Sequence, residues 1–321
     1  MARIMRDPGA GGQRHARQFH YQPVASHVHP FLVDLWDAVR NETGGRLDVG
    51  VHADNAGLKA THAEIIEMVR TGEIEFYAVM GSLLGPLAPA FEMQGLPFAF
   101  PREEAVYALM DGALGGYLRD ELAAKGIYAV PGGLLENGFR HISTIDRPIR
   151  QAGDLAGLRI RVPEGRIFDD TFRTLGAQPT PVFVLDMHRA LAERRVDGQE
   201  NPLAITESLK LHEVTRHISL TSHMWSGFNL IANPASWHGL PADVREIVLR
   251  NVRLHVGRQR VHTRAFNRDL ELTLAQRGMQ FTRPDRATFR ARLAGAFYAR
   301  WKAEFGHRAW ALLEAGVGTL A

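Results

Sequence analysis

The first third of the chain switches between two spacings of apolar residues. Three segments alternate apolar and polar residues with a period of two and predict strands: residues 17–22, 46–52 and 73–80. Between them, apolar residues recur at helical spacing, and the two predicted helices end at Gly44 and Gly72. The order strand, helix, strand, helix, strand predicts a parallel α/β sheet.

A second pattern of the same kind begins near residue 138. It predicts strands at FRHISTI and GLRIRVP, a helix over 166–175, a short strand at PTPV and a further helix at DMHRALAERR. The polar run VDGQENP (196–202) follows, then a helix to about residue 212 and strands at EVTRHISL and HMWSGFNLIAN. Two α/β units in series imply two lobes with a cleft between them.

The lobes can be assigned approximate bounds. We predict that lobe I comprises residues 17–137 and 227–266, and that lobe II comprises residues 138–226 and 267–321. Residues 1–16 are charged and lack the apolar segment of a signal peptide, so we exclude them from the fold as a disordered leader or a replaced start.

A helix of unusual length follows the second unit. From Pro241 to Gly278 the chain has no proline and one internal glycine, Gly257. An unbroken helix over this stretch would be ~57 Å long at about 1.5 Å per residue. That length exceeds what one lobe requires, so we expect the helix to cross both.

The amino-acid composition narrows the class of protein further. The chain has 321 residues, 45% of them apolar and 23% charged, with a net charge of +3, which is typical of a globular protein. Cysteine is absent, which excludes disulfides and thiolate chemistry and is compatible with any compartment. No stretch approaches 18 continuous apolar residues, so we expect no membrane-spanning segment.

Two arginines carry the clearest chemical signal. In GLRIRVP, apolar residues alternate with Arg159 and Arg161, and Pro163 places Arg161 at the carboxyl end of the strand, where α/β sheets bind ligands. Arg140 lies on the preceding predicted strand, and Asn201 could donate a further hydrogen bond. Together these groups could hold a carboxylate. The alternative, in a chain with 34 arginines, is that Arg140 and Arg161 are surface side chains that are solvated or ion-paired.

Other chemistries have weaker signals. His20, His27 and His29 lack a matching carboxylate spacing and an H-E-x-x-H motif, so we expect no metal site. No nucleotide-binding or hydrolase motif occurs, and we expect no cofactor. Residues 241–302 hold fourteen Arg or Lys against five Asp or Glu, a stripe that could touch nucleic acid; a solvated helix face explains it better.

Three blocks of this sequence resemble one known family. They are GLRIRVP, LGAQPTPV and ALAERRVDGQENP, which occur in order and at the family's spacing. They resemble the solute-binding proteins of tripartite ATP-independent periplasmic (TRAP) transporters, the DctP-like family. Weaker similarity extends over roughly residues 17–315. The resemblance implies a two-lobed, periplasmic-binding-protein-like fold that closes on an organic acid and delivers it to a membrane permease.

The resemblance also implies roles for particular residues. By analogy with the family, Arg161 binds the ligand carboxylate, Arg140 assists it, and Asn201 completes the anion site. In that case VDGQENP forms a carboxylate-binding corner, with a turn at Asp197-Gly198 and a helix beginning at Pro202. We also expect ligand contacts from Gln22 and Met80, the last residues of their strands, and from Glu164, Phe183 and Trp225.

The chain departs from the family in regions that would face the ligand's tail. Val184 stands where an aromatic residue is usual, with Phe183 one place earlier, and DNAGLKATHAE replaces the usual Q-L-G loop. Trp225, Phe183 and Phe168 could line an apolar pocket, which would favour an aromatic or aliphatic acid over a sugar acid. Alternatively, these aromatic residues belong to the core.

Two further functions remain as alternatives. An enzyme acting on a small carboxylic acid, such as a lyase or isomerase, could use Arg161 as an anion clamp. It would need a general base in the cleft, for which Glu164, Glu136 and His223 are candidates. A nucleic-acid-binding protein would use the 241–302 stripe. We predict a periplasmic binding protein rather than either alternative, with TRAP membrane subunits as its partners.

Overall fold

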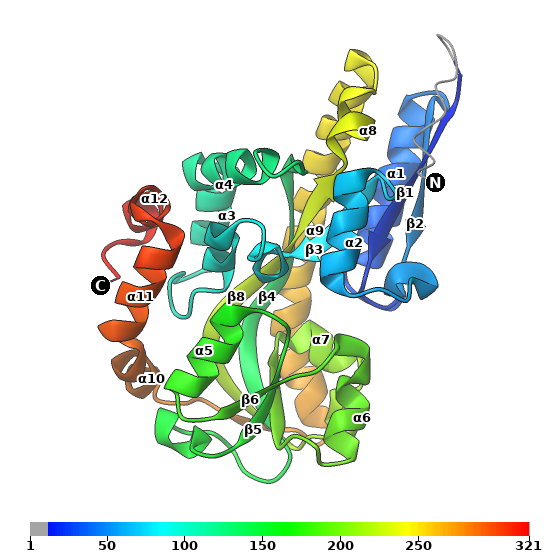
Figure 1. Ribbon diagram of the computed structural model, residues 1–321. Coiled ribbons are helices and arrows are strands. Elements are labelled where there is room, and N and C mark those ends of the chain that lie inside the picture. The colour runs from blue at the N-terminus through cyan, green and yellow to red at the C-terminus, as the bar shows by residue number, and fades with distance from the viewer. Residues whose placement is uncertain (1–11, 321) are drawn as a thin grey trace.

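Two long strands, β4 (Tyr128–Thr144) and β8 (His217–Ala232), run side by side through both lobes (Figure 1). The computed structural model describes residues 12–320, and all its strands belong to one sheet in the order β2-β1-β3-β8-β4-β7-β5-β6, with β9 beside β8. One end of β8 pairs with β3, whereas the far end of β4 pairs with β7. The two lobes are therefore two halves of a continuous sheet.

The remaining elements have the following bounds. The other strands are β1 (Arg14–His20), β2 (Leu47–His52), β3 (Phe76–Met80), β5 (Arg159–Val162), β6 (Gln178–Pro181), β7 (Gly198–Asn201) and β9 (Gln280–Thr282). The helices are α1 (His29–Glu42), α2 (His62–Thr71), α3 (Glu103–Asp111), α4 (Ala113–Ala123), α5 (Arg166–Thr174), α6 (Met187–Ala192), α7 (Leu203–Ser208), α8 (Pro234–His238), α9 (Ala242–Gln276), α10 (Arg286–Leu293), α11 (Ala296–Phe305) and α12 (His307–Val317).

Each lobe contains the parallel α/β unit that the apolar spacing predicts. In lobe I, β1 pairs in parallel with both β2 and β3. In lobe II, β5 pairs in parallel with β6 and β7. Helix α1 buries the predicted stripe, including Leu35 and Trp36, and α2 begins at a capping box formed by Thr61 and Glu64. The α/β, two-lobed fold class is confirmed.

Several predicted boundaries were wrong for identifiable reasons. Strand β1 begins at Arg14, so residues 14–16 belong to the sheet and not to the excluded leader. The part of that leader before residue 12 lies outside the described residues. The predicted strands in the middle of the chain merge into β4 and β8, because bulges absorb the polar and glycine-rich positions that suggested breaks.

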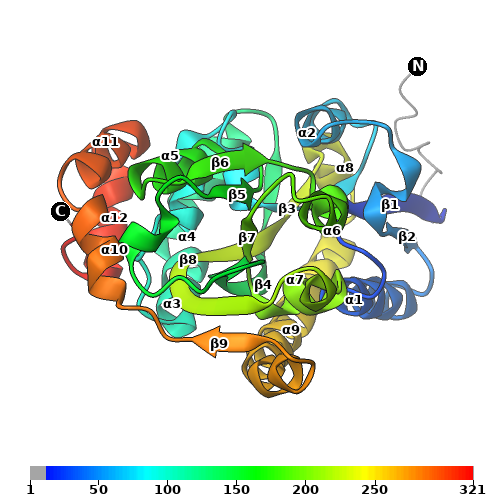
Figure 2. The same ribbon diagram turned by 90° about the horizontal axis from the view of Figure 1, so that it is seen from below.

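Helix α9 is the long helix expected from the sequence. It spans 35 residues and contacts α1 of lobe I as well as α7 and β9 of lobe II. Figure 2 shows α9 along one side of the molecule, with β9 beside it. The prediction that one helix crosses both lobes is confirmed, and α9 acts as a stiff support behind the sheet.

The exact lobe bounds stay a prediction. The divisions proposed at 137/138 and 226/227 fall inside β4 and β8, next to a bulge between Glu136 and Gly138. The C-terminal helices were assigned to lobe II, but α11 and α12 also contact elements of the other lobe: α12 packs on α3 and α4, and Tyr298 donates a hydrogen bond of 2.8 Å to the carbonyl of Pro97.

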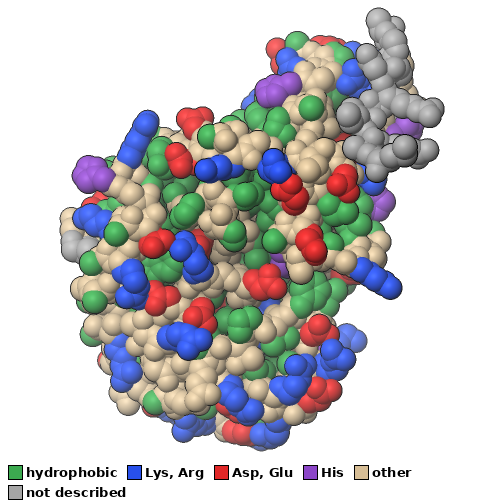
Figure 3. Space-filling view, in the orientation of Figure 1, with side chains coloured by type: hydrophobic (Ala, Val, Ile, Leu, Met, Phe, Trp, Pro, Cys, Tyr) green, Lys and Arg blue, Asp and Glu red, His purple; other side chains and the backbone are tan. Residues whose placement is uncertain are grey.

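The arginine-rich stripe over 241–302 is partly neutralised by ion pairs. Pairs join Arg250 to Glu42, Arg260 to Asp111, Arg264 to Glu104, Arg277 to Glu207 and Arg300 to Asp170. On the face drawn in Figure 3, basic and acidic side chains are interspersed. The stripe is therefore better explained as a mixed, solvated surface than as a nucleic-acid interface. Among the described helices, none is both long and apolar enough to cross a membrane.

Gly257 tests whether the stiffness of α9 depends on its one internal glycine. A Cβ added there would meet no heavy atom within 4 Å, so close packing does not require the glycine. We expect Gly257→Ala to raise the free energy of unfolding by ~1 kcal/mol, because alanine loses less backbone entropy in a helix. Thermal unfolding measures the change.

Gly227→Ala is the matched control for this substitution. Its Cβ would lie 2.2 Å from the Trp225 ring and 2.5 Å from the carbonyl oxygen of Leu135. This variant should therefore melt at a lower temperature than the wild type. A marked loss of stability in Gly257→Ala would contradict the description of α9 as an ordinary helix at that point.

Candidate ligand-binding site

A cavity lies between the two lobes, at the carboxyl edge of the parallel strands. Its empty space is about 450 Å³, which includes space open to solvent. Lobe I contributes one wall and lobe II the other. The lining residues are Tyr21, Gln22, His62, Met80, Leu83, Asn137, Arg140, Arg161, Pro163, Glu164, Val182, Phe183, Val184, Asn201 and Ile205.

Arg161 presents an incompletely bonded guanidinium to this cavity. Its side chain leaves β5 opposite the core residues Ile160 and Val162, as the alternation predicts, and is 2% exposed. Nε donates to the carbonyl oxygen of Val182 at 2.8 Å, and neither Nη group has a hydrogen bond or ion pair within residues 12–320. Burial lowers the pKa of Arg161 to about 10, partly offset by Glu200, so the group stays charged at neutral pH.

Arg140, by contrast, is saturated by Glu200. Its Nε donates to Glu200 Oε2 at 2.5 Å and its Nη2 to Oε1 at 2.6 Å, a bidentate pair with both side chains buried. Nη1 donates to Ser226 Oγ at 3.1 Å, and the guanidinium lies 5.1 Å from the Phe168 ring centroid. Strand β7 separates the strands of Arg140 and Arg161, so the two are not on adjacent strands as predicted, although both line the cavity.

The polar run VDGQENP is a buried strand and not the corner expected. Residues Gly198–Asn201 form β7, which pairs with β4 on one side and β5 on the other. The strand tolerates burial because its side chains bond internally: Gln199 donates to Ser143 Oγ at 2.5 Å, and Glu200 holds Arg140. Position 198 requires glycine because the backbone of β4 lies close to it: a Cβ there would lie 2.6 Å from the carbonyl oxygen of Ser143.

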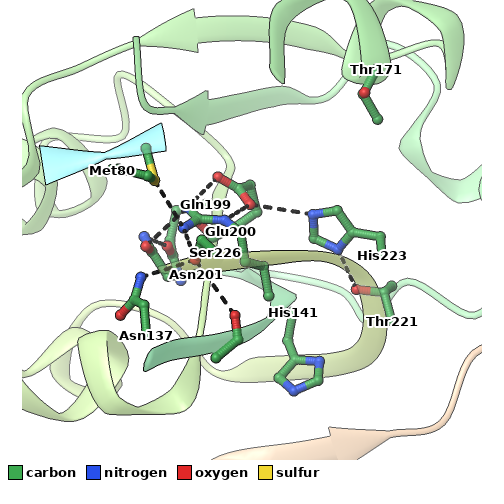
Figure 4. Close-up of polar contacts among 12 residues, drawn as sticks. Met80, Asn137, His141, Thr171, Gln199, Glu200, Asn201, Thr221, His223 and Ser226 are labelled. Atoms are coloured by element: carbon green, nitrogen blue, oxygen red, sulfur yellow. Dashed lines mark hydrogen bonds and ion pairs between the residues drawn. The ribbon is translucent and has the colours of Figure 1, made fainter. Parts of the chain in front are cut away.

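Glu200 also connects Arg140 to a buried histidine (Figure 4). His223 Nε2 lies 3.2 Å from Glu200 Oε2, and its Nδ1 lies 2.7 Å from Thr221 Oγ1. Burial lowers the pKa of His223, although Glu200 acts in the opposite direction. Burial also tends to raise the pKa of Glu200, but the charge and hydrogen bonds of Arg140 outweigh it, so that pKa lies below its ordinary value. Glu200 is therefore an anion at neutral pH.

Asn201 lines the cavity, but its amide group is already engaged. Oδ1 accepts from Arg140 Nη2 at 3.0 Å, and Nδ2 donates to Gln199 Oε1 at 2.6 Å, with Met187 Sδ 3.5 Å away. Asn201 does not cap the following helix: the backbone amide of Ala204 donates to Asn267 Oδ1 instead.

Gln22, Met80, Glu164 and Phe183 all line the cavity, as expected. Phe183 lies at its mouth, 37% exposed, with its ring centroid 5.5 Å from that of His62 in the opposite lobe. The structure thus brings together seven of the eight predicted contact residues: Arg161, Arg140, Asn201, Glu164, Gln22, Met80 and Phe183.

Trp225, the eighth, does not belong to the cavity wall. Ser226 points toward Arg140, so its neighbour on β8 points to the opposite face. There Trp225 Nε1 donates to Glu136 Oε1 at 2.8 Å, close to Tyr107. Phe168 is likewise fully buried beneath Arg140. Both aromatic residues are core, which removes most of the basis for an aromatic tail pocket.

The prediction missed Tyr21 and His62, which belong to the lobe I wall. Tyr21 directly follows β1, and His62 is the first residue of α2. The capping box T-H-A-E could have indicated that residue 62 stands in the first helical turn, where βα units face ligands.

As for metals, residues 12–320 contain no group of three or more His, Cys, Asp or Glu side chains arranged to hold a metal ion.

A two-lobed α/β fold with a polar cavity between its lobes, near the carboxyl ends of the parallel strands, is the architecture of the periplasmic-binding-protein-like class. The chain belongs to the family described as bacterial extracellular solute-binding protein, family 7 (DctP), whose model matches residues 19–302. The family predicted from the three sequence blocks is thereby confirmed.

Individual relatives agree with this assignment. A TRAP periplasmic solute-binding protein from Polaromonas sp. JS666, bound to D-erythronate, is 30% identical, with a TM-score of 0.87 over 94% of this chain and 98% of that one. The sugar acid binding protein DctPAm from Advenella mimigardefordensis, in complex with galactonate, is 25% identical, with a TM-score of 0.88 over 95% of this chain and 98% of that one.

Among curated sequences, the C4-dicarboxylate-binding periplasmic protein DctP of Rhodobacter capsulatus is 32% identical over 204 residues. That alignment covers 63% of this chain and 60% of the relative. The chain therefore spans about three-fifths of the length of that relative and of a similar solute-binding protein from Verminephrobacter eiseniae.

The two cavity arginines should differ sharply in their effect on stability without ligand. Arg140→Met leaves the buried Glu200 carboxylate without its ion-pair partner, and we expect a loss of about 3–5 kcal/mol in the free energy of unfolding. Arg161→Met removes a buried charge that has no ion pair within residues 12–320, so we expect a change of about 1 kcal/mol or less. Urea unfolding of both variants measures this, and equal losses would contradict the assignment of Glu200 to Arg140.

Proposed function

We propose that this protein captures a small organic acid in the cavity between its lobes and delivers it to the membrane subunits of a TRAP transporter. The observation that carries the proposal is the Arg161 guanidinium. It is buried and charged, and both of its Nη groups lack a protein partner within the described chain. A carboxylate suits these two donor groups, because two parallel N–H···O bonds match the planar fork of an arginine.

Electrostatics favours an anion at this point. Arg140 shares the cavity wall with Arg161, but its charge is neutralised by the buried carboxylate of Glu200. Glu164 also lines the cavity but forms no ion pair with Arg161. A ligand carboxylate would supply the missing countercharge in a site from which water is largely excluded, where such contacts are strongest.

The cavity walls suggest how binding couples to closure. Tyr21, Gln22 and His62 come from lobe I, whereas Arg161 and Phe183 come from lobe II. A ligand that contacts both walls favours the closed state by its differential contacts, and the bulged strands β4 and β8 would serve as the hinge. Arg140 and Asn201 would then shape the anion site, with Arg140 contributing less charge than Arg161 because Glu200 neutralises it.

The enzyme alternative receives less support. Of its three candidate bases, Glu136 is held between Tyr107 and Trp225, and His223 between Thr221 and Glu200. Neither lines the cavity, and of the three only Glu164 does. Membership in a solute-binding family favours transport over catalysis. The extracellular location given for the family supports a periplasmic protein that meets a membrane permease.

The relatives supply probes for a binding test. D-erythronate and galactonate are bound by two similar proteins, and a C4-dicarboxylate is named for a third. A thermal-shift screen of sugar acids, hydroxy acids, dicarboxylates and aromatic acids should identify a ligand. An acid at ~100 times its dissociation constant adds ~2.7 kcal/mol of stability.

Arg161→Ala should abolish useful binding of the acid found in that screen. Removing one partner of a buried charged contact costs ~2–5 kcal/mol, which corresponds to a loss of ~30-fold to several thousand-fold in affinity. Isothermal titration calorimetry measures it. Arg159→Ala is the matched control, since Arg159 lies two residues away and pairs with Asp197 at 2.6 Å outside the cavity. If Arg159→Ala impaired binding and Arg161→Ala did not, the proposed anion anchor would be wrong.

A further inference from the structure

The lobe I wall contains a histidine that the anion site does not use. His62 faces the cavity that Arg161 enters from the other lobe. It belongs to the segment DNAGLKATHAE, which spans residues 54–64. Its role in ligand selection can be derived from its hydrogen bonds and its neighbours.

The His62 ring is fixed on three sides. Nδ1 lies 3.1 Å from the Tyr77 hydroxyl. The Tyr21 ring meets it edge-on at 4.6 Å between centroids, and Phe183 lies 5.5 Å away across the cleft. The backbone amide of Thr61 donates to Glu64 Oε2 at 2.7 Å, which anchors the helix start that carries His62. Nε2 has no hydrogen-bond partner in the described part of the chain, so it is the atom left for a ligand.

The hydrogen bonds behind His62 determine which ring nitrogen carries the proton. Burial raises the pKa of Tyr77 well above its ordinary value, and the Asn55 side chain partly offsets this by hydrogen bonding to the hydroxyl. We assign the Asn55 amide nitrogen as the donor of that bond, because Asn55 Oδ1 has no partner in residues 12–320. The Tyr77 hydrogen can then bond to His62 Nδ1. In this assignment the proton lies on Nε2, which becomes a donor facing the cavity.

An acceptor lies on the same wall. Gln22 is 2% exposed and lines the cavity, and its Oε1 has no hydrogen-bond partner in the described chain. A buried acceptor without a donor is costly and indicates a group that a ligand would satisfy. A hydroxyl group can accept from His62 Nε2–H and donate to Gln22 Oε1 at once.

A second carboxylate would be poorly placed in the same cavity. Burial, followed by the charge of Arg161, lowers the pKa of His62 to about 4, so the ring is neutral at pH 7. Arg140 is neutralised by Glu200, and Glu164 adds a carboxylate to the wall. Within the described cavity wall, Arg161 is therefore the cation available for an acid group, and it can neutralise one.

We propose that His62 and Gln22 bind a hydroxyl group of the ligand, and that the ligand is accordingly a hydroxylated monocarboxylate. This inference rests on the proposed function and narrows it to one substrate class. Arg161 binds the carboxylate from lobe II, while His62 and Gln22 bind the hydroxyl from lobe I. Recognition of the hydroxyl thereby becomes part of lobe closure, and acids without it would leave two buried polar groups unpaired.

Matched acids test the substrate class. The probes are D-erythronate, D-3-hydroxybutyrate and lactate, each compared with its counterpart without hydroxyl groups, butyrate or propionate, together with succinate and benzoate. Titration calorimetry of the wild-type protein should give the tightest binding for a hydroxylated monocarboxylate. The counterpart without hydroxyl groups should bind ~10–100-fold more weakly. Tightest binding of succinate, benzoate or an acid without hydroxyl groups would overturn the proposal.

Variants of His62 test the residue itself. His62→Leu should weaken binding of the best hydroxylated acid ~10–100-fold and leave its counterpart without hydroxyl groups nearly unchanged. His62→Gln, which retains an N–H donor, should recover part of the affinity. His52→Leu is the control, since His52 belongs to lobe I but does not line the cavity. Equal loss for both acids in His62→Leu would overturn the assignment even if the variant remains folded.

These experiments distinguish the hydroxyl proposal from the proposed carboxylate-binding function on which it rests. If an acid binds in an Arg161-dependent manner but His62→Leu does not discriminate between the paired acids, the hydroxyl proposal fails and the carboxylate function stands. If none of the probes binds, or if binding is unchanged in Arg161→Ala, the proposed function fails and the hydroxyl proposal fails with it.

Discussion

Two arginines and one glutamate are buried together beneath the cleft, and this imbalance of charge is the constraint on which the site depends. Glu200 holds Arg140 in a bidentate pair, while Arg161 makes one hydrogen bond to a backbone carbonyl. A buried charge without a partner is unfavourable unless something supplies the countercharge. A carboxylate that enters the cleft would supply that countercharge. In the proposed function, binding strength and closure would therefore both derive from the contact with Arg161.

The fold places that contact between the two lobes. Strands β4 and β8 pass through both lobes and carry bulges near their midpoints, beside the cavity residues Asn137 and Arg140. Helix α9 supports the sheet from behind, and Gln259 on it bonds to the backbone of Glu136 at the bulge. The anion anchor lies on one side of this joint and the His62 wall on the other. Ligand contacts made across the joint would favour the closed arrangement.

Much of this could be predicted from the sequence, and the failures have physical causes. Strand alternation and Pro163 were enough to place Arg161 correctly, because both are local properties. The role of Glu200 could not be predicted, since its pairing with Arg140 spans 60 residues and gives no local signal. VDGQENP looked like a corner because its residues are polar, whereas internal hydrogen bonds allow it to be a central strand. Trp225 was misplaced because bulges in the β4–β8 pair hide which face each residue takes.

A crystal structure of the protein with a bound hydroxy acid tests the central claim most directly. The distances that matter join the ligand carboxylate oxygens to Arg161 Nη1 and Nη2. We predict two contacts of about 2.7–2.9 Å, as in other bidentate arginine–carboxylate pairs, with the Arg140–Glu200 pair intact. A carboxylate bound away from Arg161, or one that displaces Glu200 from Arg140, would contradict the account.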